Sequence, residues 1–116
     1  MKQFKFFVEN EPVKVEHILQ YEIDNVYHQF NITKYTFLSL ESNIIKLVVE
    51  LEMNNQEFLQ MIDNIKYTKI NGAIFGLSNG EINSKVTFVG VLYNSERVLN
   101  NNQCIFEFYL DYFRFF

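Results

Sequence analysis

The last fourteen residues of the chain place the strongest constraint on its fold. Half of residues 103–116 are aromatic, and the segment contains neither Gly nor Pro. Aromatic and β-branched side chains are typical of strands, whose side chains alternate between two faces. One row is apolar enough for a core and comprises Cys104, Phe106, Phe108, Leu110, Tyr112, Arg114 and Phe116. The other row mixes acidic and aromatic side chains, as on a half-covered face, and comprises Ile105, Glu107, Tyr109, Asp111, Phe113 and Phe115.

The length and composition indicate one compact domain over residues 1–116. The chain has 116 residues, is 48% hydrophobic and carries a net charge of −4. This supports a real core and argues against disorder. No apolar run approaches the ~20 residues of a membrane-spanning helix. One cysteine excludes an intrachain disulfide, so we expect a cytoplasmic protein.

The first thirty residues predict a strand followed by a helix. Residues 3–9 alternate as a strand does, and Pro12 suits the first turn of a helix. Residues 13–30 carry both a strand pattern and a helical pattern, in which Val15, Leu19 and Ile23 share a face. Eighteen residues is long for a strand and ordinary for a helix, so we predict a helix over residues 12–30.

The middle of the chain predicts a hairpin and then a second helix. Two predicted strands turn near Ser42 and cover residues 33–41 and 43–53. Leu47 belongs to the apolar row of the second strand. Asn54 and Glu57 form the signature of a capping box, and Met53 and Phe58 stand where a hydrophobic staple would pair them. We therefore predict a helix over residues 55–66.

Strands fill most of the remaining sequence. The segment Ser78-Asn79-Gly80-Glu81 is a strong signal for a type I′ hairpin between strands 67–78 and 82–93. A bulge or bend is expected at Asn71-Gly72, and a close approach of another residue at Gly90. Residues 94–102 read as a polar loop before the aromatic strand.

This order of elements predicts an α+β fold. The sheet would be mainly antiparallel, with two helices on one face, in the ferredoxin-like order β-α-β-β-α-β followed by two C-terminal strands. A hot-dog-like sheet wrapped around one helix is the alternative.

No set of residues predicts catalysis, a metal or a cofactor. On a helix, His17 and His28 would lie roughly 16 Å apart, too far for one metal ion. The pair Glu50 and Glu52 reads as a solvated face, and Cys104 as a small core residue. The glycines form no phosphate-binding loop, and there is no basic block for nucleic acid. The expectation is a non-enzymatic protein with no cofactor.

The aromatic and acidic face of the last strand is the remaining candidate site. Interfaces are rich in Tyr and Phe, and acidic residues at a rim add specificity. We therefore predict a protein–protein interaction module: a small inhibitor, an immunity-type protein or an assembly component. The partner would be another protein or a second copy of the chain, and neither nucleic acid nor membrane. The predicted partner-binding residues are Glu107, Tyr109, Asp111, Phe113 and Phe115.

Two alternatives stay open at this point. The first is a small-molecule-binding α+β domain, with room left by Gly76 and Gly90. The second is an enzyme whose site is assembled from distant segments, such as His17 or His28 with Glu50. The abundance of Phe, Tyr, Asn, Ile and Lys over Gly, Ala, Arg and Pro suggests an AT-rich bacterium or its phage.

Overall fold

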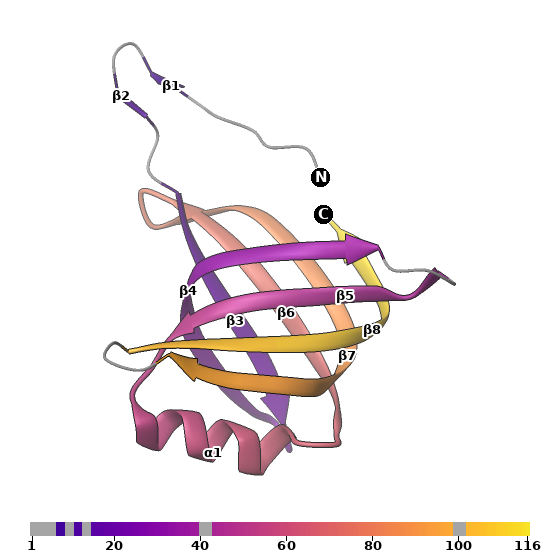
Figure 1. Ribbon diagram of the computed structural model, residues 1–116. Helices are drawn as coiled ribbons and strands as arrows, with labels where there is room; N and C mark the ends of the chain where they lie inside the picture. The colour runs from indigo at the N-terminus through magenta and orange to yellow at the C-terminus, as the bar shows by residue number, and fades with distance from the viewer. Residues whose placement is uncertain (1–6, 9–10, 13–14, 40–42, 99–101) are drawn as a thin grey trace.

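The computed structural model describes residues 7–8, 11–12, 15–39, 43–98 and 102–116, and most of them lie in one closed antiparallel barrel (Figure 1). Six strands pair in the order β3-β4-β5-β8-β7-β6, and β6 closes the barrel on β3. The elements are β1 (Phe7–Val8), β2 (Glu11–Pro12), β3 (Val15–Ile23), β4 (Val26–Ser39), β5 (Ile45–Glu52), α1 (Asn55–Ile65), β6 (Lys69–Ser78), β7 (Glu81–Val98) and β8 (Gln103–Phe115).

The predicted α+β fold is therefore wrong. The chain has one helix in its described part rather than two, and its sheet closes on itself instead of carrying helices on one face. The hot-dog-like alternative is also wrong, because α1 lies across one end of the barrel and not inside a wrapped sheet (Figure 1).

The barrel interior is filled by one apolar cluster. Each strand contributes alternate side chains to it, as expected for a small barrel. Phe106 and Phe108 of β8 are fully buried there, and Phe58 of α1 packs its ring 5.6 Å from that of Phe106. Buried residues from five of the strands and from α1 thus form a single core, and β4 adds partly buried side chains that pack against it.

Residues 15–39 form a β-hairpin, whereas we predicted a helix over residues 12–30. β3 and β4 pair from Ile23↔Val26 to His17↔Ile32. Asp24 and Asn25 connect them with φ angles of 50° and 65°. Two successive positive φ values define a tight hairpin turn, which Asn and Asp tolerate better than most residues. We predicted a helix because eighteen residues is long for one strand. That argument failed because the two-residue turn divides the segment into two strands.

The predicted second helix is confirmed. α1 covers Asn55–Ile65, and Asn54 caps it. The Asn54 side chain accepts a hydrogen bond from the Glu57 amide at 2.9 Å, while the Glu57 carboxylate accepts one from the Asn54 amide at 3.0 Å. Met61 and Ile65 are buried side chains of α1 itself, so the helix seals its end of the barrel.

The Asn79-Gly80 hairpin is also confirmed, although its register is not. Both turn residues have positive φ, and Leu77 lies opposite Ile82 as predicted. A bulge then shifts the register by one residue, so Phe75 opposes Lys85 and not Ser84, and Ile74 opposes Val86 where Ala73 was expected. An inserted residue of this kind has no signal in the alternation of the flanking residues.

Two glycines make room for large side chains. At Gly72 the ladder continues without the predicted bulge. A Cβ there would lie 2.3 Å from the Phe88 ring, so Gly72 is the position that lets this ring fit. At Gly90 a Cβ would come within 2.8 Å of the Leu110 side chain, which confirms the predicted close approach.

The polar loop predicted over residues 94–102 is mostly strand. β7 continues to Val98 and pairs with β8 as far as Val98↔Gln103. The hairpin of residues 33–41 with 43–53 is present as the β4–β5 ladder, which pairs Phe37 with Leu47. Its predicted turn near Ser42 lies outside the described residues. Most of the strand predicted over residues 3–9 also lies outside them. Pro12, which we expected in a helix, is in β2.

Substituting Gly72→Ala should destabilise the barrel by about 1–3 kcal/mol, because the new methyl group overlaps a buried ring. Chemical denaturation measures this change. The double variant Gly72→Ala, Phe88→Leu should recover part of the loss, since it removes the ring that the methyl group meets. Equal stability of the Gly72→Ala variant and the wild-type protein would contradict this account of the glycine.

Candidate functional site

The predicted partner-binding strand divides into two surfaces, because β8 contains a bulge. Val89 pairs with Tyr112 and Gly90 with Leu110, which leaves Asp111 as the inserted residue. The bulge exchanges the two rows of side chains. Beyond it Tyr112 is exposed, contrary to the prediction, and Phe113 packs against the core.

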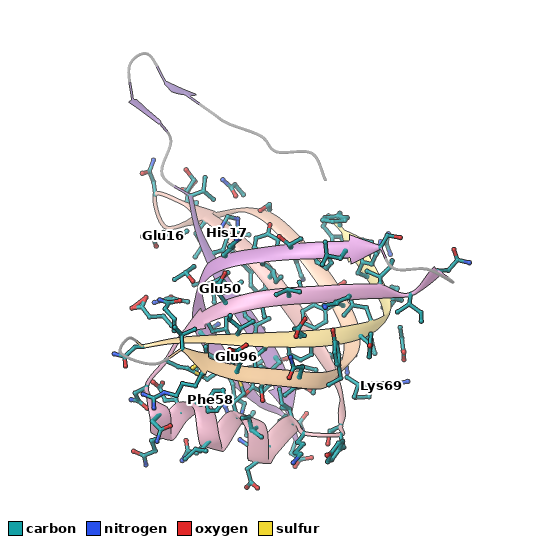
Figure 2. All side chains as sticks on the ribbon, in the orientation of Figure 1. Glu16, His17, Glu50, Phe58, Lys69 and Glu96 are labelled. Atoms are coloured by element: carbon teal, nitrogen blue, oxygen red, sulfur yellow. The ribbon has the colours of Figure 1, made fainter. Side chains whose placement is uncertain are left out.

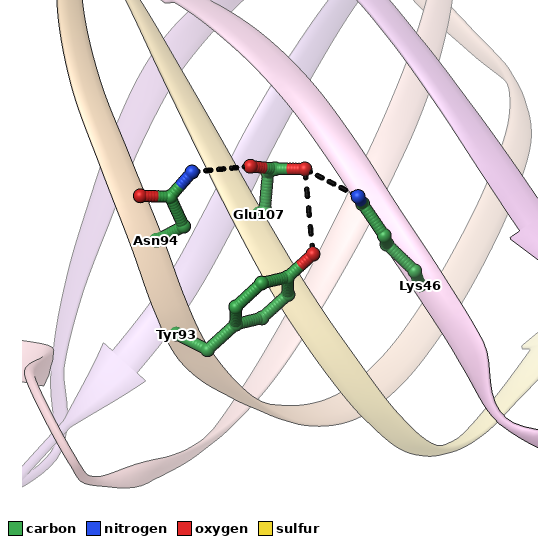
Figure 3. A network of polar contacts seen from close by, with 4 residues as sticks. All are labelled: Lys46, Tyr93, Asn94 and Glu107. Carbon is green, nitrogen blue, oxygen red and sulfur yellow. Dashed lines mark hydrogen bonds and ion pairs between the residues drawn. The ribbon is translucent and has the colours of Figure 1, made fainter.

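Glu107 is the centre of a polar cluster on the outer wall of the barrel (Figure 3). Its carboxylate lies 2.6 Å from the Lys46 ammonium and accepts a hydrogen bond of 3.3 Å from the Tyr93 hydroxyl. The Asn94 amide donates to its other oxygen. These four residues come from three neighbouring strands, β5, β7 and β8, so the cluster spans that part of the wall.

A second bulge brings Tyr93 and Asn94 to the same carboxylate. Leu92 pairs with Phe108 and Asn94 with Glu107, so Tyr93 is inserted between them. Bulges re-aim side chains in this way. The Tyr93 ring stacks on that of Tyr109 with centroids 3.8 Å apart. Glu107 and Tyr109 therefore lie together in one cluster, and Lys46, Tyr93 and Asn94, which the sequence did not single out, complete it.

The charges of the polar cluster stabilise one another. The hydrogen bond from Lys46, followed by that from Asn94, lowers the pKa of Glu107. The same bond to Glu107 raises the pKa of Lys46. Both groups are charged at neutral pH, and the ammonium and hydroxyl donors satisfy the carboxylate. Such a group is a poor general acid or base, because its pKa moves away from neutrality.

Asp111 stands apart from this cluster. Its carboxylate pairs with Lys69 of β6 at 2.5 Å, and both side chains are more than half exposed. An exposed pair of this kind contributes little to stability.

The other two predicted residues, Phe113 and Phe115, lie in a chain of rings that we call the aromatic rim. It begins with His17 and Tyr35, whose rings are 5.1 Å apart, and continues from Tyr35 to Phe37 at 6.1 Å. Phe37 then stacks on Phe113 at 5.2 Å and meets Phe115 at 5.8 Å. The aromatic rim consists of His17, Tyr35, Phe37, Phe113 and Phe115.

The aromatic rim occupies the end of the barrel opposite α1. Figure 1 shows the C-terminal end of β8 and the end of β4 on the side away from the helix, and Figure 2 places His17 there. Phe115 is 64% exposed and the adjacent Phe116 is 66% exposed. One end of the barrel is thus sealed by a helix, whereas the other presents aromatic rings to solvent.

The histidines and Glu50 do not form a catalytic pair. His17 belongs to the inward row of β3 with Leu19, whereas Glu50 alternates with the buried Val49 and Leu51 and therefore faces outward. His28 stacks on the Tyr21 ring at 5.1 Å. Among the described residues, no group of three or more His, Cys, Asp or Glu side chains could hold a metal ion.

Cys104 is a buried residue of the core. Its side chain is fully inaccessible, and burial raises the pKa of its thiol. This confirms its predicted place in the apolar row and leaves it without the accessible, activated setting of a nucleophile.

A shallow hollow of about 250 Å³ lies on the outer wall formed by β3, β6 and β7. The exposed rings of Tyr27 and Tyr112 flank it, and Glu22 and Lys85 contribute charges of opposite sign. Its volume is slightly below the usual ~300–1,000 Å³ of ligand sites. Gly76 and Gly90, which we expected to open a cleft, do not line it.

Comparison with known proteins gives no family or function. No protein-family model, no curated protein and no solved structure matches the chain. Within the described residues, no helix is both long and apolar enough to cross a membrane.

The sequence contained a weak signal for the residues that we missed. Tyr35 and Phe37 alternate in the strand predicted over residues 33–41, which indicates that they share a face. Nothing in that alternation shows that this face meets Phe113, because the contact depends on barrel closure and on the bulge at Asp111.

The two aromatic residues on either side of the Asp111 bulge should respond differently to the same substitution. Phe113→Asp should lower the free energy of unfolding by about 2 kcal/mol or more, because it places a charge against the core. Tyr109→Asp should cost less than about 1 kcal/mol, since that side chain is 43% exposed. Denaturant titration of both variants compares them, and equal losses would show that the bulge does not separate the rows.

Acid should weaken the fold in part through His17. Burial lowers its pKa below the ordinary 6.5, so on acidification the unfolded chain takes up a proton that the folded chain resists. Stability contributed by neutral His17 is present above about pH 6.5 and falls as the pH drops below it. The melting temperature of His17→Gln should therefore change less between about pH 7.5 and 5.5 than that of the wild-type protein, with His28→Gln as the matched control. Identical pH profiles for His17→Gln and the wild type would contradict this role.

Proposed function

We propose that this protein is a non-enzymatic binding module that engages another protein through the aromatic rim. The observation that carries the proposal is the exposure of Phe115, which packs on Phe37 and Phe113 at the end of the barrel that α1 leaves uncovered. Large exposed aromatic side chains that gather in one place mark interaction sites, whereas scattered ones need no explanation.

The exposed rings offer enough apolar area to drive binding. A Phe side chain buries on the order of 200 Å², so a ring that is about two thirds exposed can still bury on the order of 130 Å². At ~25 cal/mol per Å² this is worth about 3 kcal/mol per ring before the costs of association. The Phe115 ring packs against the rings of Phe37 and Phe113, so its orientation is held before a partner binds.

The proposal keeps part of the predicted contact surface. Phe113 and Phe115 stay in it, whereas Glu107 and Tyr109 form a separate polar cluster on the wall and Asp111 pairs with Lys69. An inhibitor, an immunity-type protein or an assembly component in the cytoplasm of an AT-rich bacterium, or of a phage that infects it, suits such a surface. A second copy of the chain is an equally acceptable class of partner.

A second candidate function is the binding of a small polar ligand in the hollow on the outer wall. The observation that favours it is the meeting of Glu22, Asn71 and Lys85 between two exposed tyrosines. Lys85 already contacts the rings of Phe75 and Phe116.

The binding function predicts that Phe115→Asp abolishes capture of a partner while the protein remains folded. The change introduces a charge at an exposed ring, so it should move the melting temperature little and reduce capture at least about tenfold. Affinity capture from cells of the encoding organism, quantified against the wild-type protein, measures it.

Leu59→Asp is the matched control for this experiment. Leu59 is 57% exposed on α1, at the sealed end of the barrel, so the variant makes the same change in chemistry away from the aromatic rim. Light scattering of all three proteins decides whether the captured partner is a second copy. If both variants capture the partner as the wild type does, the aromatic rim is not the binding surface.

A further inference from the structure

β4 changes its pairing partner halfway along its length. From Val26 to Ile32 it pairs with β3, and from Ile32 to Ser39 it pairs with β5. The change comes at Thr33, where a bulge interrupts the ladder. Its second half, residues 34–39, therefore projects beyond β3 at the end of the barrel that carries the aromatic rim.

We call the side of residues 34–39 that faces away from β5 the open edge, because no described residue pairs with it. Within the part of the chain that the structure describes, these six residues pair only with β5. Alternate backbone N–H and C=O groups on that side point outward and can pair with an added strand. The edge contains no Pro and a single charged residue, Lys34, so it has few of the features that block such pairing.

The open edge and the aromatic rim are parts of one surface. Tyr35 and Phe37 lie on the open strand, and their side chains turn inward to the rings of His17, Phe113 and Phe115. A strand added along the edge would take the place beside β4 that β3 leaves after His17↔Ile32, its last pair with β4. Every second side chain of that strand would then face the rim, while the others would face solvent.

We propose that the partner contributes an extended segment that adds to β4 as a further antiparallel strand, with apolar side chains at alternate positions against the aromatic rim. This inference rests on the proposed function and specifies the chemistry of its partner. Main-chain hydrogen bonds supply much of the affinity in this mode of recognition, and alternate side chains supply the specificity. Continuity with the β3–β4 ladder favours an extended strand over a helix, because a helix offers no backbone groups to the edge.

Methylation of backbone amides in a peptide probe tests the proposal. The probe is a ten-residue peptide in which valine or phenylalanine alternates with threonine. Two derivatives carry N-methyl groups, one on the odd-numbered amides and one on the even-numbered amides. Only one set can bond to the edge, so one derivative should lose at least about tenfold in affinity by calorimetry while the other keeps most of its binding.

Hydrogen exchange of the full chain locates the contact. Alternate amides of residues 34–39 should exchange rapidly in the free protein and become protected when the peptide is bound. Slow exchange of all six amides in the free monomer would show that the edge is already filled by the chain itself, and would overturn the proposal.

The outcomes separate this inference from the proposed function. Equal binding of both methylated peptides, with loss of binding in Phe115→Asp, would retain the aromatic rim as a site and overturn the added strand. Failure of the wild-type protein to bind the unmodified peptide, although it captures a partner through Phe115, would also overturn it. Failure of capture and of peptide binding together would overturn both.

Discussion

Closure of one antiparallel sheet onto itself is the constraint on which the rest of this structure depends. In a barrel of this size side chains fill the interior, so a large side chain on one strand needs a small residue on the neighbouring strand. Gly72 beside Phe88 and Gly90 beside Leu110 meet that need. The helix α1 then seals one end with Met61 and Ile65, so the interior is closed to solvent there.

The same closure explains the open end. Strands of a barrel are tilted and staggered, so their ends do not coincide. β4 continues past β3, and β8 continues beyond Leu110, which pairs with Ile45 at the start of β5. The two projecting segments bring Phe37 and Phe113 together. The aromatic rim and the open edge thus arise from one geometric cause, and they face the same partner in the interaction that we propose.

Local signals in the sequence were reliable where local chemistry decides the structure. The capping box at Asn54, the turn at Asn79-Gly80 and the aromatic strand were all predicted. The strands of residues 15–30 were not, because Asp24-Asn25 is a weaker turn signal than Asn-Gly and length then favoured a helix. The candidate site was predicted in part: single-residue bulges at Asp111 and Tyr93 re-aim its side chains, and strand alternation does not reveal where such insertions fall.

The burial of Cys104 has a practical consequence. It is the only thiol in the chain, it is fully inaccessible, and it lies on β8 between the two strands that pair with it. A thiol reagent can reach it only when the barrel separates along β8. The rate of labelling under native conditions therefore reports that opening without an engineered residue, and labelling faster than complete unfolding reveals a partial separation of the wall.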